Sequence, residues 1–225
     1  MKNSKFLIEV FKQNKTEVFM LRFGPLETNC YVVKNSSVIS VIDPSAFYEG
    51  EKSFLKEFIR SLNGSMQFII NTHGHFDHIS ANAFLKNNFP DAQILIHFAD
   101  SEKLQSPIKN RSAELSLNIV SPDADKELKD NDIVKIGEAF FKVIHTPGHT
   151  KGSIMLYGEG ILFSGDTLFA GTVGTAKEYK GAFNEMIQSI KEKVLRLPGS
   201  TLILPGHMET STIEEEKSLN PFIQS

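Results

Sequence analysis

Cysteine is almost absent from this chain. Cys30 is the one cysteine among 225 residues, which excludes an intramolecular disulfide and a cysteine-based zinc site. No apolar run approaches the ~18 residues that a membrane-spanning helix needs. The first stretch, Met1 to Phe11, is too charged and its apolar part too short for a signal peptide. We therefore expect a cytoplasmic protein without a membrane partner.

A strong charge of either sign is also missing. The 24 Lys and Arg residues nearly balance the 27 Asp and Glu residues, and no dense basic run occurs. This lack of a basic footprint argues against a dedicated nucleic-acid-binding protein but leaves a small charged substrate possible. The length suits one large α/β domain.

Short apolar runs separated by polar residues or by Gly and Pro predict strands in both halves of the chain. In order, they are Phe6–Phe11, Val18–Phe23, Cys30–Val33, Val38–Ile42, Phe68–Ile70, Ile94–Ile96, Ile133–Ile136, Phe140–Ile144, Ile154–Tyr157, Ile161–Phe163 and Leu202–Leu204. Apolar residues at helical spacing predict helices at about Gly50–Leu62, Ile79–Asn87 and Phe183–Leu197. This order predicts two sheets packed face to face with helices outside. Ser106–Asp125 is expected to be a mobile or substrate-facing loop, or a plain surface connection.

Four separated places in the chain share one design, in which an apolar strand ends, a glycine permits a sharp turn and a metal-type ligand adjoins that glycine. They are His73-Gly74-His75-Phe76-Asp77-His78, His145-Thr146-Pro147-Gly148-His149, Ser164-Gly165-Asp166 and Pro205-Gly206-His207. Ligands of α/β sheets gather outside the carboxyl ends of strands, and glycine allows close backbone approach there. If these strand ends lie side by side, five histidines and two aspartates converge. Two metal ions need that number of ligands.

Spacing within the first of these places favours two metal ions. His73 and His75 are two residues apart, so on an extended segment they point the same way and can bind one ion. Asp77 and His78 stand at the start of the next helix and can bind a second ion. A carboxylate from another turn can bridge two ions about 3.5–4 Å apart. The residues that complete the two sets and bridge them are His149, His207 and Asp166.

The His73-x-His75-x-Asp77-His78 string resembles the signature of the metallo-β-lactamase superfamily, and the later candidates follow in that family's chain order. The resemblance covers nearly the whole chain. It implies a four-layer αββα sandwich as a single domain over residues 1–225, with no separate C-terminal substrate domain. It further implies one metal ion on His73, His75 and His149, a second on Asp77, His78 and His207, and Asp166 as the bridge.

Within that family, three segments are most similar to glyoxalase II (hydroxyacylglutathione hydrolase) and its short relatives. They are Thr72–His78, His145–Thr150 and Gly165–Phe169. The likeness implies that a metal-bound hydroxide hydrolyses a thioester such as S-lactoylglutathione, with Asp77 and Asp166 as catalytic residues. His and carboxylate ligands suit zinc, iron and manganese alike, and of two divalent ions we expect zinc first, with iron or manganese as alternatives. Asp166 stands where several β-lactamases carry cysteine, and His75 stands where oxygen-reducing diiron relatives carry glutamate, so both of those activities rank lower.

A second likeness concerns the substrate. Lys177-Glu178-Tyr179-Lys180-Gly181 is similar to a Lys-x-Tyr-x-Gly stretch that contacts glutathione in the long glyoxalase II enzymes. The Lys177 ammonium can pair with a carboxylate of the tripeptide, and the Tyr179 hydroxyl can hydrogen-bond it. A solvated loop is the alternative. The chain also departs from both groups: only a short tail follows His207, and Gly174-Thr175-Ala176-Lys177 replaces the Gly-Arg-x-Asp of many short relatives.

Three other functions stay open. An iron-dependent persulfide dioxygenase would use a subset such as His73, His149 and Asp166. A lactonase or phosphodiesterase would use the same metal pair. A non-catalytic binding protein would keep the ligands for structure alone, which the presence of all seven candidates argues against.

Four further residues have an expected structural role or a choice of roles. His145 is expected to orient a ligand or to serve structure. Asp43 is expected to hold a ligand histidine or to cap a turn. His97 and Cys30 are expected to be structural.

Overall fold

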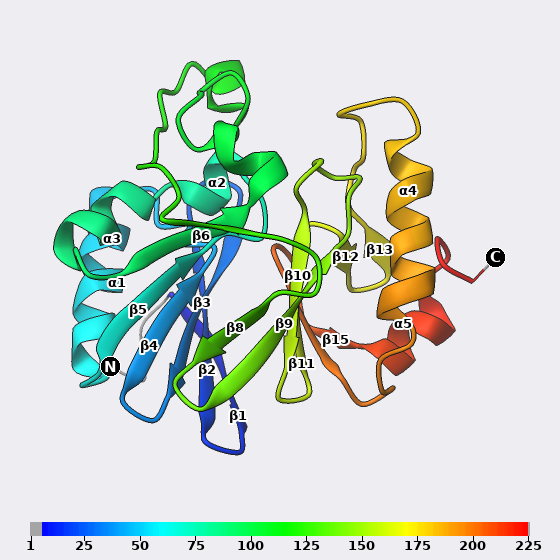
Figure 1. Cartoon of the computed structure of the whole chain (residues 1–225), viewed down its shortest axis with the longest axis horizontal. Coiled ribbons are helices and arrows are strands. Elements are labelled where there is room, and N and C mark those ends of the chain that lie inside the picture. Colours follow the sequence, from blue (N-terminus) through cyan, green and yellow to red (C-terminus); the bar gives the residue numbers. More distant parts are fainter. Residues whose placement is uncertain (1–5, 225) are drawn as a thin grey trace.

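The computed structural model describes residues 6–224 of the chain as four layers (Figure 1). Helices α1 (Glu49–Ser61) and α3 (Asn82–Asn88) cover the outer face of one sheet. Helices α4 (Ala182–Ser189) and α5 (Ile213–Leu219) cover the outer face of the other sheet. The predicted αββα sandwich is therefore confirmed. Within the described residues, no helix has the length and apolar character to cross a membrane.

The first sheet contains the N-terminal strands. Its first four strands pair antiparallel, and its fourth to seventh strands pair parallel. In spatial order they are β1 (Leu7–Gln13), β2 (Thr16–Phe23), β3 (Thr28–Asn35), β4 (Val38–Ile42), β5 (Ser65–Ile70), β6 (Gln93–His97) and β7 (Lys126–Leu128).

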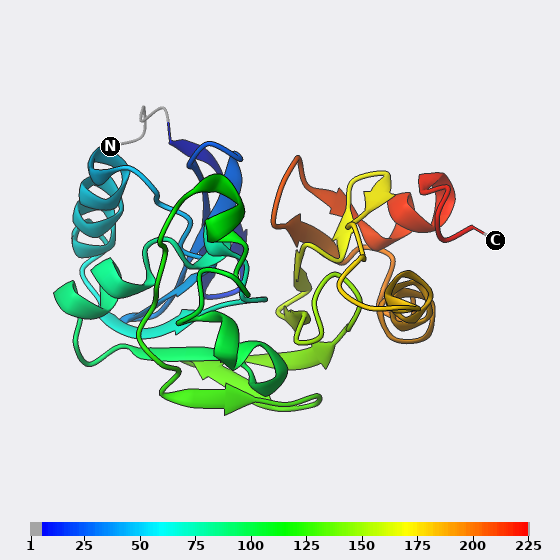
Figure 2. The ribbon, with the colours of Figure 1, turned by 90° about the horizontal axis from the view of Figure 1, so that it is seen from above.

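The second sheet contains the C-terminal strands. In spatial order they are β15 (Ser211–Thr212), β14 (Leu202–Pro205), β11 (Ile161–Gly165), β10 (Ile154–Gly158), β9 (Ala139–His145) and β8 (Ile133–Ile136). Only β11 and β14 pair parallel within this sheet. A separate hairpin consists of β12 (Leu168–Phe169) and β13 (Thr172–Val173). Seen from above, the two halves of the chain lie side by side with their helices outermost (Figure 2).

Alternation along the strands builds a core on both faces of each sheet. In β3, Cys30 and Val32 pack towards α1 and α3, whereas Tyr31 and Val33 pack towards the second sheet. Successive side chains of a strand point to opposite faces, so a sheet covered on both sides needs apolar residues at nearly every position. This explains why these strands read in the sequence as unbroken apolar runs.

The helix predicted at Ile79–Asn87 corresponds to α3, which begins three residues later than predicted, and a separate short helix precedes it. The short α2 (Phe76–Ile79) ends before α3 begins. The Asn71 side-chain amide donates to the His78 carbonyl, and the Ala81 amide donates to the Pro44 carbonyl. These contacts compete with the helical hydrogen bonds at the junction, so Asp77 and His78 lie on a separate turn of helix.

Other differences involve short or irregular elements. The helix predicted at Phe183–Leu197 is α4 followed by a π-helical turn, Ile190–Val194. The predicted loop Ser106–Asp125 contains the 3-10 helix η2 (Ser112–Leu115), and another, η1 (Phe98–Lys103), directly follows β6. Strands of two or three residues and the polar helix α5 also went unpredicted, because their apolar patterns are too short or too weak.

Strand direction brings the four glycine turns together. β11 and β14 are parallel neighbours, and β9 runs the same way because β10 is antiparallel to both β9 and β11. Their carboxyl ends therefore share one edge of the second sheet. The end of β5 reaches this edge from the first sheet, where the Ile154 amide donates to the Thr72 carbonyl over 2.9 Å.

The core between the sheets supports this junction, so a cavity there should be costly. Phe163 is fully buried and lies 5.3 Å from the Tyr31 ring and 5.9 Å from the Phe141 ring, between centroids. We expect Phe163→Ala to lower the free energy of unfolding by about 3–5 kcal/mol, measured by urea denaturation. Phe140→Ala is the control, since that side chain is 57% exposed and should change stability by less than about 0.5 kcal/mol. Equal losses in both variants would contradict this account of the core.

Candidate metal centre

All seven ligand candidates from the sequence meet at the junction of the two sheets. Their nitrogen and oxygen atoms form three overlapping groups, each with its atoms within 4.8 Å of one another. The first group is His73, His75 and His149, the second group is Asp77, His78 and His207, and a linking group is His73, His78 and Asp166. Because His73 and His78 each belong to two groups, the three groups lie next to one another.

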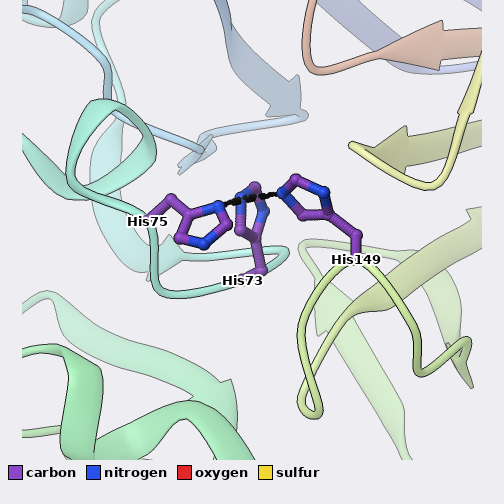
Figure 3. Close-up of side chains that lie close together, drawn as sticks. All are labelled: His73, His75 and His149. Atoms are coloured by element: carbon purple, nitrogen blue, oxygen red, sulfur yellow. Dashed lines mark hydrogen bonds between the residues drawn. The ribbon is translucent and has the colours of Figure 1, made fainter. Parts of the chain in front are cut away.

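Three histidines in the first group point at one common centre (Figure 3). The His149 Nε2 atom lies 2.9 Å from His75 Nδ1 and 3.2 Å from His73 Nε2, and the last two atoms are 3.1 Å apart. Imidazole nitrogens about 2.0–2.1 Å from a tetrahedral ion lie about 3.3 Å from one another. The observed spacing therefore matches a single ion in contact with all three rings.

The second group combines the Asp77 carboxylate with His78 and His207. The Asp77 Oδ2 atom lies 3.3 Å from His78 Nε2 and 3.2 Å from His207 Nε2. Asp166 lies between the groups: its Oδ2 atom is 3.5 Å from both His149 Nε2 and His207 Nε2. Its Oδ1 atom is 3.3 Å from His78 Nε2. This placement suits a carboxylate that bridges two ions.

Asp43 orients one histidine of each set from behind. Its Oδ2 atom accepts hydrogen bonds from His78 Nδ1 at 2.9 Å and from the Thr72 hydroxyl at 2.7 Å. The same hydroxyl oxygen lies 3.2 Å from His73 Nδ1 and can accept its proton. A histidine whose far nitrogen donates in this way presents its other nitrogen as a lone pair. Of the two roles expected for Asp43, the structure shows the contact with a candidate histidine.

Backbone carbonyls orient two of the remaining three histidines. The His149 Nδ1 atom donates to the Thr175 carbonyl at 2.8 Å, and His207 Nδ1 donates to the Leu26 carbonyl at 3.1 Å. The Thr28 hydroxyl donates to Asp77 Oδ2 at 2.9 Å. These contacts turn the Nε2 atoms of both rings towards the centre, and sequence alone had no signal for them.

Burial leaves the first two histidines neutral. It lowers the pKa of His73 well below its usual value and that of His75 to about 3, and neighbouring histidines act in the same direction. A neutral imidazole is the form that binds a metal ion.

In the second group, the charges of the neighbouring aspartates affect the histidine pKa values more than burial does. Burial alone would lower the pKa of His78 and His207, but Asp77 and Asp166 outweigh it. The pKa of His78 rises well above its usual value, and that of His207 rises to about 9. Burial would raise the pKa of both carboxyls, yet the same histidines hold it well below its usual range. Two buried carboxylates therefore stay charged and require positive charge beside them.

The donor set fits two divalent ions. Within residues 6–224, His78 Nε2 and Asp166 Oδ1 are buried, and although they lie 3.3 Å apart, neither has a partner in hydrogen-bond geometry. Buried polar atoms are normally satisfied, so these two point to a missing partner. A Cβ at Gly206 would lie 2.1 Å from Asp166 Oδ1, so only glycine lets the fourth turn pass this close.

A pocket of about 730 Å³ opens beside His75 and His149. One wall comes from η1 and the loop after it, and the other comes from the segments around Lys151 and Lys177. The loop Ser106–Asp125 contributes Ile108, Lys109, Arg111 and Glu114 to the first wall. This loop therefore faces the cluster and is more than a plain connection.

The two residues predicted to bind substrate are placed differently. Lys177 lines the pocket, with no ion pair to any described residue. Tyr179 is not among the lining residues, and its hydroxyl donates to Glu185 at 2.7 Å. Lys151, which the sequence did not single out, also lines the pocket.

The other singled-out residues stand apart from the cluster. His145 donates from Nε2 to the Lys151 carbonyl at 2.9 Å, which closes the loop that carries His149. Its ring stacks on His97 with centroids 4.0 Å apart. Cys30 is buried in the core, and burial raises the pKa of its thiol.

Comparison with known proteins gives consistent matches along the chain. A family model described as the metallo-β-lactamase superfamily matches residues 23–207. Hydroxyacylglutathione hydrolase GloC of Haemophilus influenzae is 29% identical, over 88% of this chain and 94% of that protein. BLEG-1 B3 metallo-β-lactamase has a TM-score of 0.85 and 32% identity, over 92% of this chain and 99% of that structure. TTHA1623 in a di-iron-bound form has a TM-score of 0.74 and 30% identity, over 91% and 100%.

Metal content provides a direct test of the cluster. We expect two equivalents of Zn²⁺ per chain after reconstitution, and one in His207→Ala, because that change removes a nitrogen from the second group only. Glu192→Ala, which removes an exposed carboxylate of the π-helical turn outside all three groups, is the control and should keep two equivalents. Elemental analysis of dialysed protein gives the numbers. A wild type that retains no zinc, or a His207→Ala variant that retains two equivalents, would contradict the proposed sets.

Proposed function

Because this chain belongs to the metallo-β-lactamase superfamily, we propose that it is a metal-dependent hydrolase of thioesters, with S-lactoylglutathione as a representative substrate. The convergence of five histidines and two aspartates beside an open pocket carries this proposal. The relative named hydroxyacylglutathione hydrolase GloC supports the choice of thioester. We also propose a cytoplasmic location, because the reducing conditions there are consistent with a thiol product.

The seven residues are proposed to hold two ions, with zinc as the first choice and iron or manganese as alternatives. One ion would be held by His73, His75 and His149, the other by Asp77, His78 and His207, with Asp166 as the bridge. When bound, the ions supply a hydroxide nucleophile near neutral pH and neutralise charge on the carbonyl oxygen.

The chain's own residues orient this reaction. In the proposal, Asp77 Oδ2, itself held by the Thr28 hydroxyl, directs the nucleophile towards the carbonyl carbon. Asp166 keeps both sets at a fixed separation. A carbon–oxygen bond forms, the carbon–sulfur bond breaks, and the thiol leaves as a thiolate. No protein group has to protonate the leaving sulfur, because a thiolate is already a stable anion.

The pocket supports a leaving group that needs no proton. Its three carboxylates are Glu102, Glu114 and Glu178, and each forms an ion pair: with Lys109, Arg111 and Lys103 respectively. The paired cations hold the pKa of Glu102 and Glu114 below its usual range. Glu102 and Glu114 are therefore ionised at neutral pH and are poor proton donors.

The charges on the pocket walls favour an anionic substrate tail. Among its five cations, Lys103, Lys109 and Arg111 each pair with a carboxylate, whereas Lys151 and Lys177 form no ion pair with any described residue. Lys151 lies over the Tyr179 ring, with its ammonium 5.9 Å from the centroid. Two ammonium groups without carboxylate partners beside the cluster suit a thiol that carries a carboxylate, as glutathione does.

A β-lactam is the second candidate substrate, because the B3 metallo-β-lactamase BLEG-1 is 32% identical over nearly its whole length. Opening a lactam leaves an amine nitrogen that requires a proton. The paired carboxylates of the pocket give no ready donor, so this activity ranks lower. Hydrolysis of a lactone or a phosphodiester remains an alternative for the same metal pair, and persulfide oxidation remains an alternative for a single iron on a subset such as His73, His149 and Asp166.

Thioester hydrolysis is tested first with purified protein and S-lactoylglutathione. We expect kcat/KM of ~10⁴ M⁻¹s⁻¹ or more, typical of an enzyme on its own substrate. Prior chelation should abolish turnover, and added Zn²⁺ should restore it. A chromogenic cephalosporin, a lactone and a persulfide with an oxygen electrode serve as comparison substrates.

Two variants separate the metal cluster from background hydrolysis. His75→Ala and Asp166→Ala should each lower kcat/KM by at least about 10³-fold while the chain still folds, judged by circular dichroism. Wild-type activity in either variant would overturn the assignment. Faster turnover of the cephalosporin or the lactone than of the thioester would leave the hydrolase and change its substrate, whereas faster oxygen consumption with the persulfide would replace the hydrolase with a dioxygenase.

Charge recognition is tested with a double variant, Lys151→Ala and Lys177→Ala. It should raise KM for the glutathione thioester about 3–10-fold, the loss expected for exposed charge-assisted contacts. KM for a thioester of an uncharged thiol should not change. Lys109→Ala is the control, because its ammonium already pairs with Glu102. Equal effects on both thioesters would refute recognition by charge.

A further inference from the structure

Asp100 is a fully buried carboxylate near the three-histidine group, and no sequence pattern singles it out. It lies in η1, the 3-10 helix that follows β6. A buried carboxylate is costly unless hydrogen bonds or opposite charge stabilise it. Its partners therefore indicate what it is for.

The partners of Asp100 are two turns from different sheets. Its Oδ2 atom accepts the Gly74 amide at 2.8 Å, and its Oδ1 atom accepts the Gly152 amide at 2.9 Å. Gly74 separates the two histidines of the first turn, and Gly152 lies in the turn that begins at His149. A single carboxylate thus joins the two pieces of chain that supply the three-histidine group.

Close packing reinforces these hydrogen bonds. A Cβ at Gly74 would lie 2.6 Å from the Lys103 Cβ atom, and a Cβ at Gly152 would lie 2.6 Å from the Asp100 Cβ atom. Real side chains do not tolerate such distances, so η1 touches both turns directly. The strand ends themselves are joined by the Ile154 amide and Thr72 carbonyl. Asp100 joins the turns beyond these strand ends, which carry the histidines.

Charge on η1 provides a second link to the same turn. The Lys103 ammonium lies 4.0 Å from Asp100 Oδ1 and forms an ion pair with Glu178. The Glu178 Oε2 atom accepts the Lys151 amide at 2.8 Å. Lys103 is 6% exposed, so solvent screens this pair little. Asp100, Lys103 and Glu178 together form a brace that links η1 to the turn after His149.

We infer that Asp100 is a positioning residue that sets the spacing of the three-histidine group and thereby its metal affinity. The inference rests on the proposed metal assignment. Residues that fix the orientation of metal ligands typically contribute 10–100-fold to affinity. Asp100 acts on the histidines through the backbone amides of their turns and not through the rings. Its removal should therefore change the spacing between the two turns and leave the hydrogen bonds of the histidine rings in place.

The test compares metal-free wild type with Asp100→Asn, titrated with Co²⁺ or Zn²⁺ against a chromophoric chelator. The asparagine keeps the shape but has one acceptor oxygen for two amides. We expect the affinity for one equivalent to fall about 10–100-fold and that for the other to stay within about threefold. The Co²⁺ absorption bands of the weakened equivalent should also shift, which a loss of stability alone would not cause.

Glu51→Gln is the matched control. Glu51 is also a buried carboxylate, and it accepts hydrogen bonds from the Gly24 and Phe47 amides. Neither Gly24 nor Phe47 is next in sequence to a metal-ligand candidate. We expect both metal equivalents to bind this variant as they bind wild type. Thermal unfolding of the metal-free proteins shows whether the two variants lose comparable stability.

The outcomes are distinct. Unchanged affinity and spectra in folded Asp100→Asn would overturn the inference and leave the metal site. A wild type that binds no metal would overturn the proposed function and this inference together. If Asp100→Asn does not fold, Lys103→Met decides, because it removes the charge from the brace and keeps the aspartate. It should weaken the same equivalent several-fold, and wild-type binding would refute the brace.

Discussion

Two buried carboxylates impose the constraint around which the site is arranged. Asp77 and Asp166 lie in a place from which water is largely excluded, and charge there is costly without a nearby cation. Protons on His78 and His207 meet this need in the metal-free chain, since the carboxylates raise the pKa of both rings. A pair of divalent ions would meet it more completely. The neutral rings of His73 and His75 opposite add donors without adding charge, so the cluster is matched to cations.

The fold meets this constraint by ending strands from both sheets at one edge. Polar residues tolerated at the edge would be costly within either core, where alternate side chains face apolar layers on both sides. The strands therefore remain continuous apolar runs, and the chemistry is confined to the turns that follow them. Contacts across the junction, such as the Ile154 amide with the Thr72 carbonyl, hold the two halves in register. The site is thus a product of sheet packing as much as of its own residues.

Much of this site could be predicted because its side chains follow a tight sequence pattern. The string from His73 to His78 and the later glycine turns identified the residues that the structure brings together, and the apolar runs identified most strands. The rest depends on groups that have no pattern. The Thr175 and Leu26 carbonyls orient histidines, yet any residue supplies a carbonyl. The break between α2 and α3 arises from tertiary hydrogen bonds, and Asp100 looks like any helical aspartate until its two amide partners are known.

The arrangement favours two ions over one. A single iron on His73, His149 and Asp166, as in the dioxygenase alternative, would leave Asp77, His78 and His207 as a buried ionic group without catalytic use. Such groups are weak contributors to stability, and apolar residues of similar size often serve as well. Yet Asp43 accepts hydrogen bonds from both His78 and the Thr72 hydroxyl next to His73, so one carboxylate orients both sets. Orientation of both sets by one residue is simply explained if each set holds a metal ion. The shared contacts of Asp43 therefore favour a hydrolase with a metal pair.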